Sequence, residues 1–191
     1  IKIGMEDALS VRFVGYNKTN EVIYLVDSRD RNTAALYTLN LKTGEKSLVA
    51  EDAKSDFGGA MIHPTEKNLQ AVAFYYDTLQ WEILDQSMAK DMEYLARLED
   101  GEVRVFSRSL DDKIWIVGYT VDDGPMRYYY YDRSKNNAEF LFTDRDELED
   151  KPLSKMYPVV IRSRDGLDLL SYYTLPLGSD ADGDGLPDHP L

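Results

Sequence analysis

Short apolar strands separated by polar turns recur along the chain at a spacing of about 46 residues. Three segments share the order of apolar strand, polar turn and second strand rich in β-branched and aromatic residues: residues 11–27, 60–77 and 103–120. A further strand follows in each copy and ends in a polar residue, at Asn40, Asp85 and Asp132. The first and third copies add a turn and a fourth strand, with Thr43-Gly44 and Asn136-Asn137 as the turn residues. Four short antiparallel strands at this spacing predict the blades of a β-propeller.

The second copy departs from this pattern after Asp85. Apolar residues spaced for one face of an amphipathic helix follow, and Gly101 is the stop signal: Met88, Met92, Leu95 and Ala96. We expect this face to pack in the core rather than to bind a partner helix. The predicted fold class is therefore all-β, with about three four-stranded blades and one helical insertion. A β-sandwich with accidental spacing is the alternative.

The last forty residues differ from the repeats. Residues 144–153 are acidic and polar and predict a linker or a short helical turn. Strands are expected at 158–162 and 168–175, because Asp165-Gly166 between them is a strong hairpin signal. We expect two domains, residues 1–152 as blades and residues 153–191 as the first hairpin and acidic loop of another domain.

Composition narrows the class of protein. Apolar residues make up 43% of the 191 positions, which is enough for a folded core. The net charge of -13 argues against nucleic acid and anionic membranes as partners. Cysteine is absent, so thiolate metal sites and a cysteine nucleophile are excluded. Three blades are too few to close a propeller and Ile1 is not an initiator methionine, so we expect further sequence outside this chain.

The blades followed by "PVVIRSRDGLDLLSYYTLPLG" resemble the prolyl oligopeptidase family of serine peptidases, closest to its acylaminoacyl and alanyl dipeptidyl peptidase branch. In that family a β-propeller precedes an α/β-hydrolase domain, and a junction motif forms the first hairpin of the hydrolase sheet. The matching residues are Val160, Ile161, Arg164, Asp165, Gly166, Leu169, Tyr172, Thr174, Pro176 and Gly178. The resemblance runs from about residue 10 to the end of the chain.

The family's chemistry needs a serine in a G-x-S-x-G turn, followed by an aspartate and a histidine. No G-x-S-x-G occurs in this sequence, and its histidines are His63, in a turn between two strands, and His189. Neither matches the family's triad histidine, so no catalytic residue is assigned and we expect the chain alone to be inactive. The resemblance implies that the propeller admits short peptides to a serine outside this chain.

The segment "DADGDGLPD" carries a candidate metal site. Asp180, Asp182 and Asp184 take positions 1, 3 and 5 of a calcium-loop pattern, and Asp188 takes position 9. Leu191 stands at position 12, where a bidentate glutamate usually completes such a site. Two interpretations remain open: the loop binds a Ca²⁺ ion that stabilises it, or it is a solvated acidic loop without a metal. No other cofactor is required.

The sequence thus predicts the substrate-gating propeller part of a serine peptidase that hydrolyses short peptides. Its expected partners are these peptides and the hydrolase domain of the same protein, and a homo-oligomer is left open. A propeller-only scaffold that binds proteins is the alternative, although such a scaffold has no use for the junction hairpin. The compartment is either cytoplasmic or periplasmic, with the periplasm slightly favoured.

Overall fold

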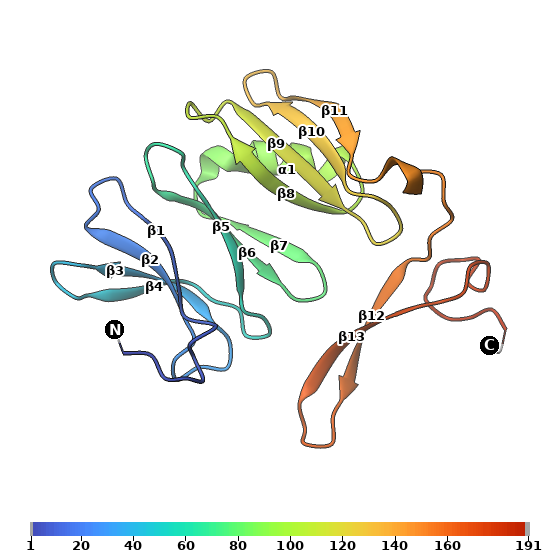
Figure 1. Cartoon of the computed structure of the whole chain (residues 1–191), viewed down its shortest axis with the longest axis horizontal. Coiled ribbons are helices and arrows are strands. Elements are labelled where there is room, and N and C mark those ends of the chain that lie inside the picture. Colours follow the sequence, from blue (N-terminus) through green and yellow to red (C-terminus); the bar gives the residue numbers. More distant parts are fainter. Residues whose placement is uncertain (1, 190–191) are drawn as a thin grey trace. The chain divides into compact units, whose positions relative to one another are not determined.

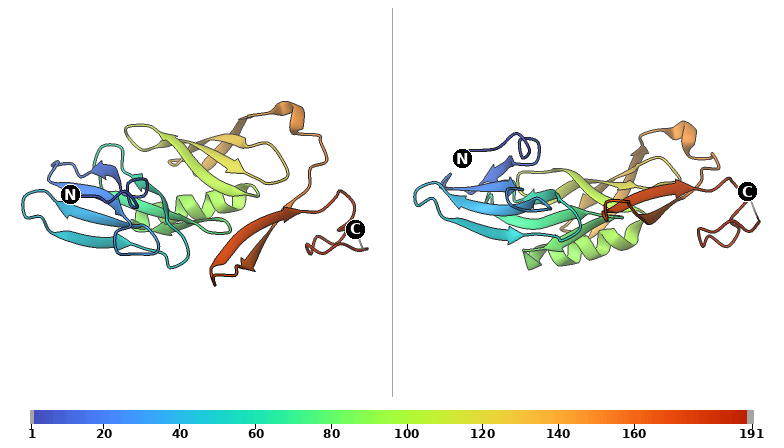
Figure 2. Two further views of the ribbon diagram at one scale, coloured as in Figure 1. Left: turned by 60° about the horizontal axis from the view of Figure 1, so that its bottom comes forward. Right: turned by 90° about the horizontal axis from the view of Figure 1, so that it is seen from below.

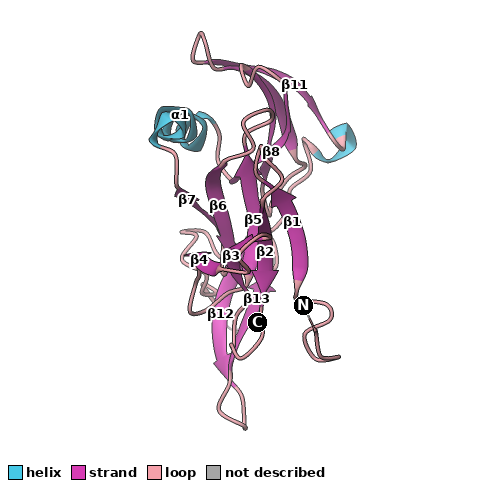
Figure 3. Cartoon of the chain, turned by 90° about the vertical axis from the view of Figure 1, so that its left-hand side faces the viewer, coloured by secondary structure: helices cyan, strands magenta, loops and turns pink. Residues whose placement is uncertain are grey.

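The computed structural model describes residues 2–189, and antiparallel β-strands dominate it (Figure 3). Contacts divide the chain into two compact units. Unit 1 comprises Ile1–Tyr94 and Arg108–Ile114, and unit 2 comprises Leu95–Ser107 and Trp115–Leu191. None of the described helices is long and apolar enough to cross a membrane.

Unit 1 holds two successive antiparallel sheets (Figure 1). The first sheet has the strand order β1-β2-β3-β4, formed by Arg12–Tyr16, Val22–Asp27, Ala35–Asn40 and Lys46–Ala50. The second has the order β5-β6-β7, formed by Phe57–Ile62, Leu69–Tyr75 and Leu79–Ile83. Apolar residues of both sheets share one core cluster: Tyr24, Val26, Ala34, Leu36 and Ala50 from the first, and Phe57, Val72 and Phe74 from the second. The two sheets therefore cover each other through their apolar faces, as stacked blades do.

A helix follows β7 in the place of a fourth strand. The 3-10 turn η1 (Gln86–Met88) leads into α1 (Ala89–Leu98), and the Asp85 side chain caps η1 by accepting a hydrogen bond from the Ser87 N–H. Met88, Met92 and Leu95 are buried, which confirms the predicted core face. Ala96 is exposed instead, so the prediction was wrong for this residue and the apolar stripe is narrower than expected.

Unit 2 contains the third sheet and an isolated hairpin. The sheet has the strand order β11-β10-β9-β8, formed by Asn137–Thr143, Arg127–Asp132, Ile114–Thr120 and Glu102–Arg108. One face of this sheet is a buried aromatic layer, in which Trp115 meets Tyr131 edge-on and Tyr119 meets Tyr129. The 3-10 turn η2 (Asp146–Leu148) follows, as expected for the acidic linker.

The hairpin pairs β12 (Met156–Arg162) with β13 (Asp168–Thr174) and forms a two-stranded ribbon (Figure 2). The predicted hairpin is confirmed, with Gly166 at a φ of 89° in its turn. Arg162 pairs with Asp168, so residues 163–167 connect the strands, as the expected strand bounds imply. The domain boundary expected at residue 152 stays a prediction.

The turns confirm the repeat in detail. A residue with positive φ stands at the same place in the first turn of each sheet: Asn20, Lys67 and Asp112, at 59°, 59° and 56°. The residue that opens each turn accepts hydrogen bonds from backbone N–H groups through its side chain: Asn17, His63 and Ser109. The fold is thus a series of propeller blades, and the described residues form no closed barrel.

Candidate functional site

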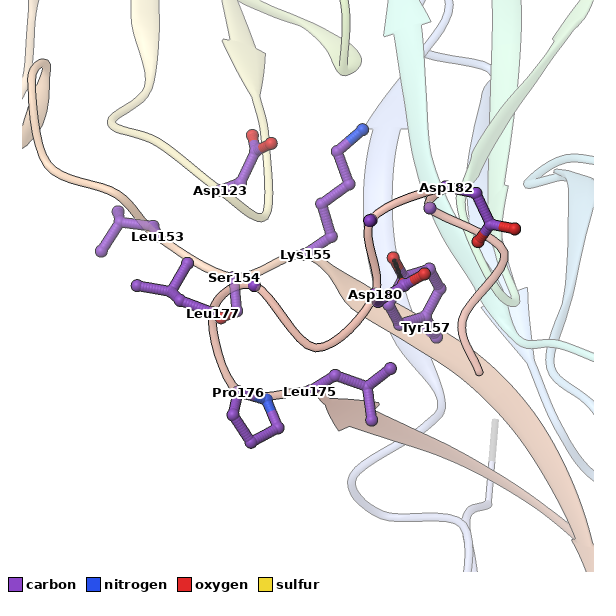
Figure 4. Close-up of a pocket in the computed structure, with 13 residues that line it drawn as sticks. Asp123, Leu153, Ser154, Lys155, Tyr157, Leu175, Pro176, Leu177, Asp180 and Asp182 are labelled. Atoms are coloured by element: carbon purple, nitrogen blue, oxygen red, sulfur yellow. Dashed lines mark hydrogen bonds between the residues drawn. The ribbon is translucent and has the colours of Figure 1, made fainter. Parts of the chain in front are cut away.

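A hollow of about 320 Å³ lies in unit 2, where the β9–β10 loop, the segment before β12 and the loop after β13 meet (Figure 4). Asp123 comes from the first of these segments, Ser154 and Lys155 from the second, and Leu175 and Asp180 from the third. The Met156 N–H donates to Asp122 Oδ2 at 2.6 Å, which ties the start of β12 to the β9–β10 loop. Segments that are distant in sequence therefore form one site.

The acidic loop, residues 180–188, folds around the carboxylate of Asp180. Asp180 Oδ1 accepts from the Asp184 N–H at 3.1 Å, and Asp180 Oδ2 accepts from the Gly185 N–H at 3.2 Å. Gly183 and Gly185 have φ values of 74° and 82°, a backbone region that other residues rarely adopt. The glycines of the motif thus permit the tight wrapping that the sequence predicts.

Three of the four predicted ligands come together. One ligand oxygen from each of Asp180, Asp182 and Asp184 lies within 4.8 Å of the others. Asp188 closes the loop instead, because its Oδ2 accepts from the Ala181 N–H and its own N–H donates to the Ser179 carbonyl. Position 12, Leu191, lies outside the described residues. Calcium binding stays a prediction, now with three carboxylates in suitable positions.

Two tyrosines attach this loop to the hairpin. The Tyr157 hydroxyl donates to Asp180 Oδ2 at 2.5 Å, and the Tyr173 hydroxyl donates to the Gly185 carbonyl at 2.7 Å. The hydrogen bond to Asp180 raises the pKa of Tyr157 to about 12. The same bond lowers the pKa of Asp180, which therefore keeps its negative charge below the ordinary carboxyl range.

The residues that sequence analysis missed are Asp123, Lys155 and Tyr157. Each belongs to a different local pattern, and no spacing rule joins a propeller loop to a hairpin strand. Only the structure brings them beside the acidic loop. The carboxylates of Asp123, Asp180 and Asp182 outnumber the ammonium of Lys155, so the hollow is net negative.

The two histidines differ in their surroundings, and His63 also lies with its Nε2 3.9 Å from Asp112 Oδ2. His63 Nδ1 accepts from the Thr65 and Glu66 N–H groups at 3.2 and 3.0 Å, so this side chain is used to hold the β5–β6 turn. His189 is exposed. The prediction that the chain contributes no catalytic residue stays a prediction.

Comparisons with known proteins find similarity to peptidases in both sequence and structure. No protein-family profile matches the chain. Dipeptidyl aminopeptidase BIII of Pseudoxanthomonas mexicana is 42% identical over 189 residues, which is 99% of this chain and 27% of that protein. Dipeptidyl peptidase family member 6 of Caenorhabditis elegans is 26% identical over 179 residues, which is 92% of this chain and 24% of that protein. The chain thus spans about a quarter of the length of these relatives.

Solved structures show the same fold at low sequence identity. Prolyl oligopeptidase B of Galerina marginata, bound to a macrocyclization substrate, matches with a TM-score of 0.57 and 10% identity over 85% of this chain and 23% of that one. A prolyl endopeptidase matches with a TM-score of 0.53 and 11% identity over 85% of this chain and 24% of that one. The chain is therefore similar to peptidases of the prolyl oligopeptidase family and has the fold of their propeller region.

Proposed function

We propose that this chain is the substrate-gating propeller part of a serine peptidase that hydrolyses short peptides. The observation that carries the proposal is the 42% identity to a dipeptidyl aminopeptidase across 99% of the chain. In this proposal the propeller forms a wall of the active-site cavity and excludes folded proteins. The net charge of -13 suits a wall that attracts the ammonium group of a peptide.

The β12–β13 hairpin supports the assignment of residues 153–191 to a hydrolase domain. Val159 and Ile161 point to one face of the ribbon, and Val160 and Tyr172 point to the other, because side chains alternate along a strand. All four are exposed. A two-stranded ribbon is at best marginally stable alone, and strands that are apolar on both faces are typical of sheets covered on both sides. We therefore propose that the hairpin joins the sheet of an α/β domain.

The catalytic serine is proposed to lie outside this chain. The sequence has no nucleophile turn, and His63 uses its Nδ1 as an acceptor in a structural turn. The alternative is a propeller that only binds proteins. The two proposals differ in one observable property, which is the presence of an activated serine in the full-length protein.

A fluorophosphonate probe, which reacts covalently with activated serines, tests this difference. We expect the full-length gene product to be labelled and to release a fluorophore from dipeptide-coupled substrates. The 191-residue chain should show neither reaction. Failure of a folded full-length protein to react with the probe would favour the protein-binding scaffold, and labelling of the 191-residue chain would contradict the location of the serine.

We also propose that the acidic loop binds Ca²⁺, because three carboxylates gather there on a glycine-shaped backbone. Titration of the chain with CaCl₂ in a calorimeter should show binding. Asp182→Asn keeps the side-chain shape but removes one charge, and it should weaken binding roughly tenfold or more. Asp165→Asn is the matched control, since this exposed aspartate lies in the hairpin turn, outside the three-carboxylate group. Absence of heat at millimolar CaCl₂ would exclude the site.

A further inference from the structure

His63 opens the β5–β6 turn and holds it with a ring nitrogen. Its Nδ1 accepts hydrogen bonds from the Thr65 N–H at 3.2 Å and from the Glu66 N–H at 3.0 Å. A ring nitrogen that accepts hydrogen bonds carries no proton, so the proton of the neutral ring is on Nε2. The side chain is 22% exposed, and its Nε2 lies 3.9 Å from Asp112 Oδ2 of the β8–β9 turn. The contacts of the ring therefore select one tautomer.

The equivalent turns of the other two sheets use acceptors that take up no proton near neutral pH. The Asn17 Oδ1 accepts from two backbone N–H groups of its turn, at 3.0 and 3.1 Å. The Ser109 Oγ accepts from two backbone N–H groups at 3.2 and 3.0 Å. Histidine is the side chain that gains a proton between about pH 8 and pH 5. Of these three turns, the β5–β6 turn is thus the one with a titratable acceptor.

From this difference we propose that His63 is a pH-sensitive switch, in which uptake of a proton at Nδ1 releases the β5–β6 turn. A protonated Nδ1 is a donor, so it no longer accepts from the Thr65 and Glu66 N–H groups. Both of these residues are exposed, so water hydrates the two amides instead. The backbone bond from the His63 N–H to the Asn68 carbonyl, at 2.9 Å, still closes the base of the turn. This inference does not depend on the proposed peptidase function.

Charged groups of three turns act on this ring. Asp112 attracts an imidazolium, but both of its carboxylate oxygens already accept from the Arg108 guanidinium, which repels one. Glu66 pairs with Lys18 of the β1–β2 turn at 2.8 Å, and this contact holds the pKa of the Glu66 carboxyl below its usual range. The other charged residues of these turns are Lys67 and the ion pair of Asp111 with Lys113. Each carboxylate is thus already paired with a cation, so the added proton gains little in exchange for two hydrogen bonds.

The β5–β6 turn also connects the second sheet with the first. The Tyr24 hydroxyl of β2 donates to the Lys67 carbonyl at 2.7 Å, and the ion pair of Lys18 with Glu66 joins the two turns. Release of the turn should therefore loosen the contact between these blades. The sign follows from proton uptake: the native turn needs the neutral ring, whereas the unfolded chain takes up the proton without losing these bonds. The stability of this region should fall as the pH falls through the range in which histidine gains its proton.

Hydrogen exchange of the 191-residue chain at about pH 8 and about pH 5.5, followed by mass spectrometry, tests the switch. Labelling times are scaled for the intrinsic pH dependence of amide exchange. Protection of residues 63–68 should fall by about fivefold or more at the lower pH, as expected for the loss of hydrogen bonds. Protection of residues 17–22, the turn that Asn17 holds, should stay the same. Unchanged protection of residues 63–68, or an equal loss in both turns, would overturn the inference.

His63→Asn removes the proton site but keeps an acceptor. Asn40 shows that asparagine suits this geometry, because its Oδ1 accepts from the N–H groups two and three residues later, at 2.9 and 3.1 Å. The variant should protect residues 63–68 equally at both pH values. His189→Asn is the matched control, since it removes the other histidine of the chain, which is exposed, and should leave the pH response unchanged. A response that persists in His63→Asn, or one that is lost in His189→Asn, would contradict the assignment to His63.

Nuclear magnetic resonance of the wild-type ring gives a check that needs no variant. At about pH 8, ¹H–¹⁵N spectra should show His63 as the Nε2–H tautomer. The amides of Thr65 and Glu66 should lose protection over the same pH interval in which the ring gains its second proton. A ring that takes up the proton while both amides stay protected would overturn the inference, and so would an Nδ1–H tautomer at the higher pH.

Discussion

Arg108→Ala should lower the free energy of unfolding of unit 1 by about 3–5 kcal/mol, because it leaves a buried carboxylate without its main cation. The Arg108 side chain is 9% exposed and that of Asp112 is 3% exposed. The guanidinium donates to both carboxylate oxygens of Asp112, with the Nε–Oδ1 distance at 2.5 Å. A bidentate ion pair of this kind is stronger than a single contact, and losing one inside a protein lowers its stability substantially.

Arg108 also connects the β8–β9 turn to the second sheet. Its guanidinium donates to Gln70 Oε1 at 2.5 Å and to the Ile62 carbonyl at 3.2 Å. Gln70 is 2% exposed, so its side-chain oxygen has little access to water as a substitute donor. The loss should therefore reach β5 and β6, and hydrogen exchange should become faster in these strands.

Urea unfolding followed by circular dichroism measures this effect. Arg162→Ala is the matched control, since Arg162 and Asp168 form an ion pair whose side chains are 68% and 56% exposed. An exposed pair contributes about 0–1 kcal/mol, so the control should stay close to wild type. If Arg108→Ala costs no more than Arg162→Ala, the buried pair does not hold the turn to the second sheet.

The strands could be predicted from the sequence because each blade repeats the same local pattern. Asn17, His63 and Ser109 open equivalent turns, and a positive-φ residue stands two residues before the second strand in each: Asn20, Lys67 and Asp112. Alternation of apolar residues and turn chemistry are local properties, so they are visible without a structure. Ala96 was assigned to the wrong face because a helical period alone does not define how wide the buried stripe is.

The candidate site was only half visible in the sequence. The spacing of Asp180, Asp182 and Asp184 predicted that their carboxylates lie close together, because the three residues fall within a segment of five residues. Asp123 and Lys155 join the same hollow through the hydrogen bond between Met156 and Asp122, which connects residues 34 positions apart. No periodicity encodes such a contact.

Trp115→Ala should destabilise unit 2 by about 3–5 kcal/mol, the range for removal of a large buried aromatic side chain. Trp115 is fully buried, and its ring meets Tyr131 edge-on at a centroid distance of 5.7 Å. The Arg133 guanidinium carbon lies 4.7 Å from the centre of the Trp115 ring, so the substitution also removes a cation–π contact. The third sheet would lose the centre of its buried aromatic layer.

The loss of stability in Trp115→Ala should be larger in the third sheet than in unit 1. Hydrogen exchange followed by mass spectrometry should show faster exchange in β9 and β10 of Trp115→Ala, with a smaller change in β2 and β3. Trp115→Phe keeps part of the aromatic volume and should lose clearly less stability, which separates the volume effect from a general loss of folding. Tyr16→Ala is a matched control, because this aromatic residue is 47% exposed and should cost far less. Equal losses for Trp115→Ala and Tyr16→Ala would mean that the buried aromatic layer does not stabilise the third sheet.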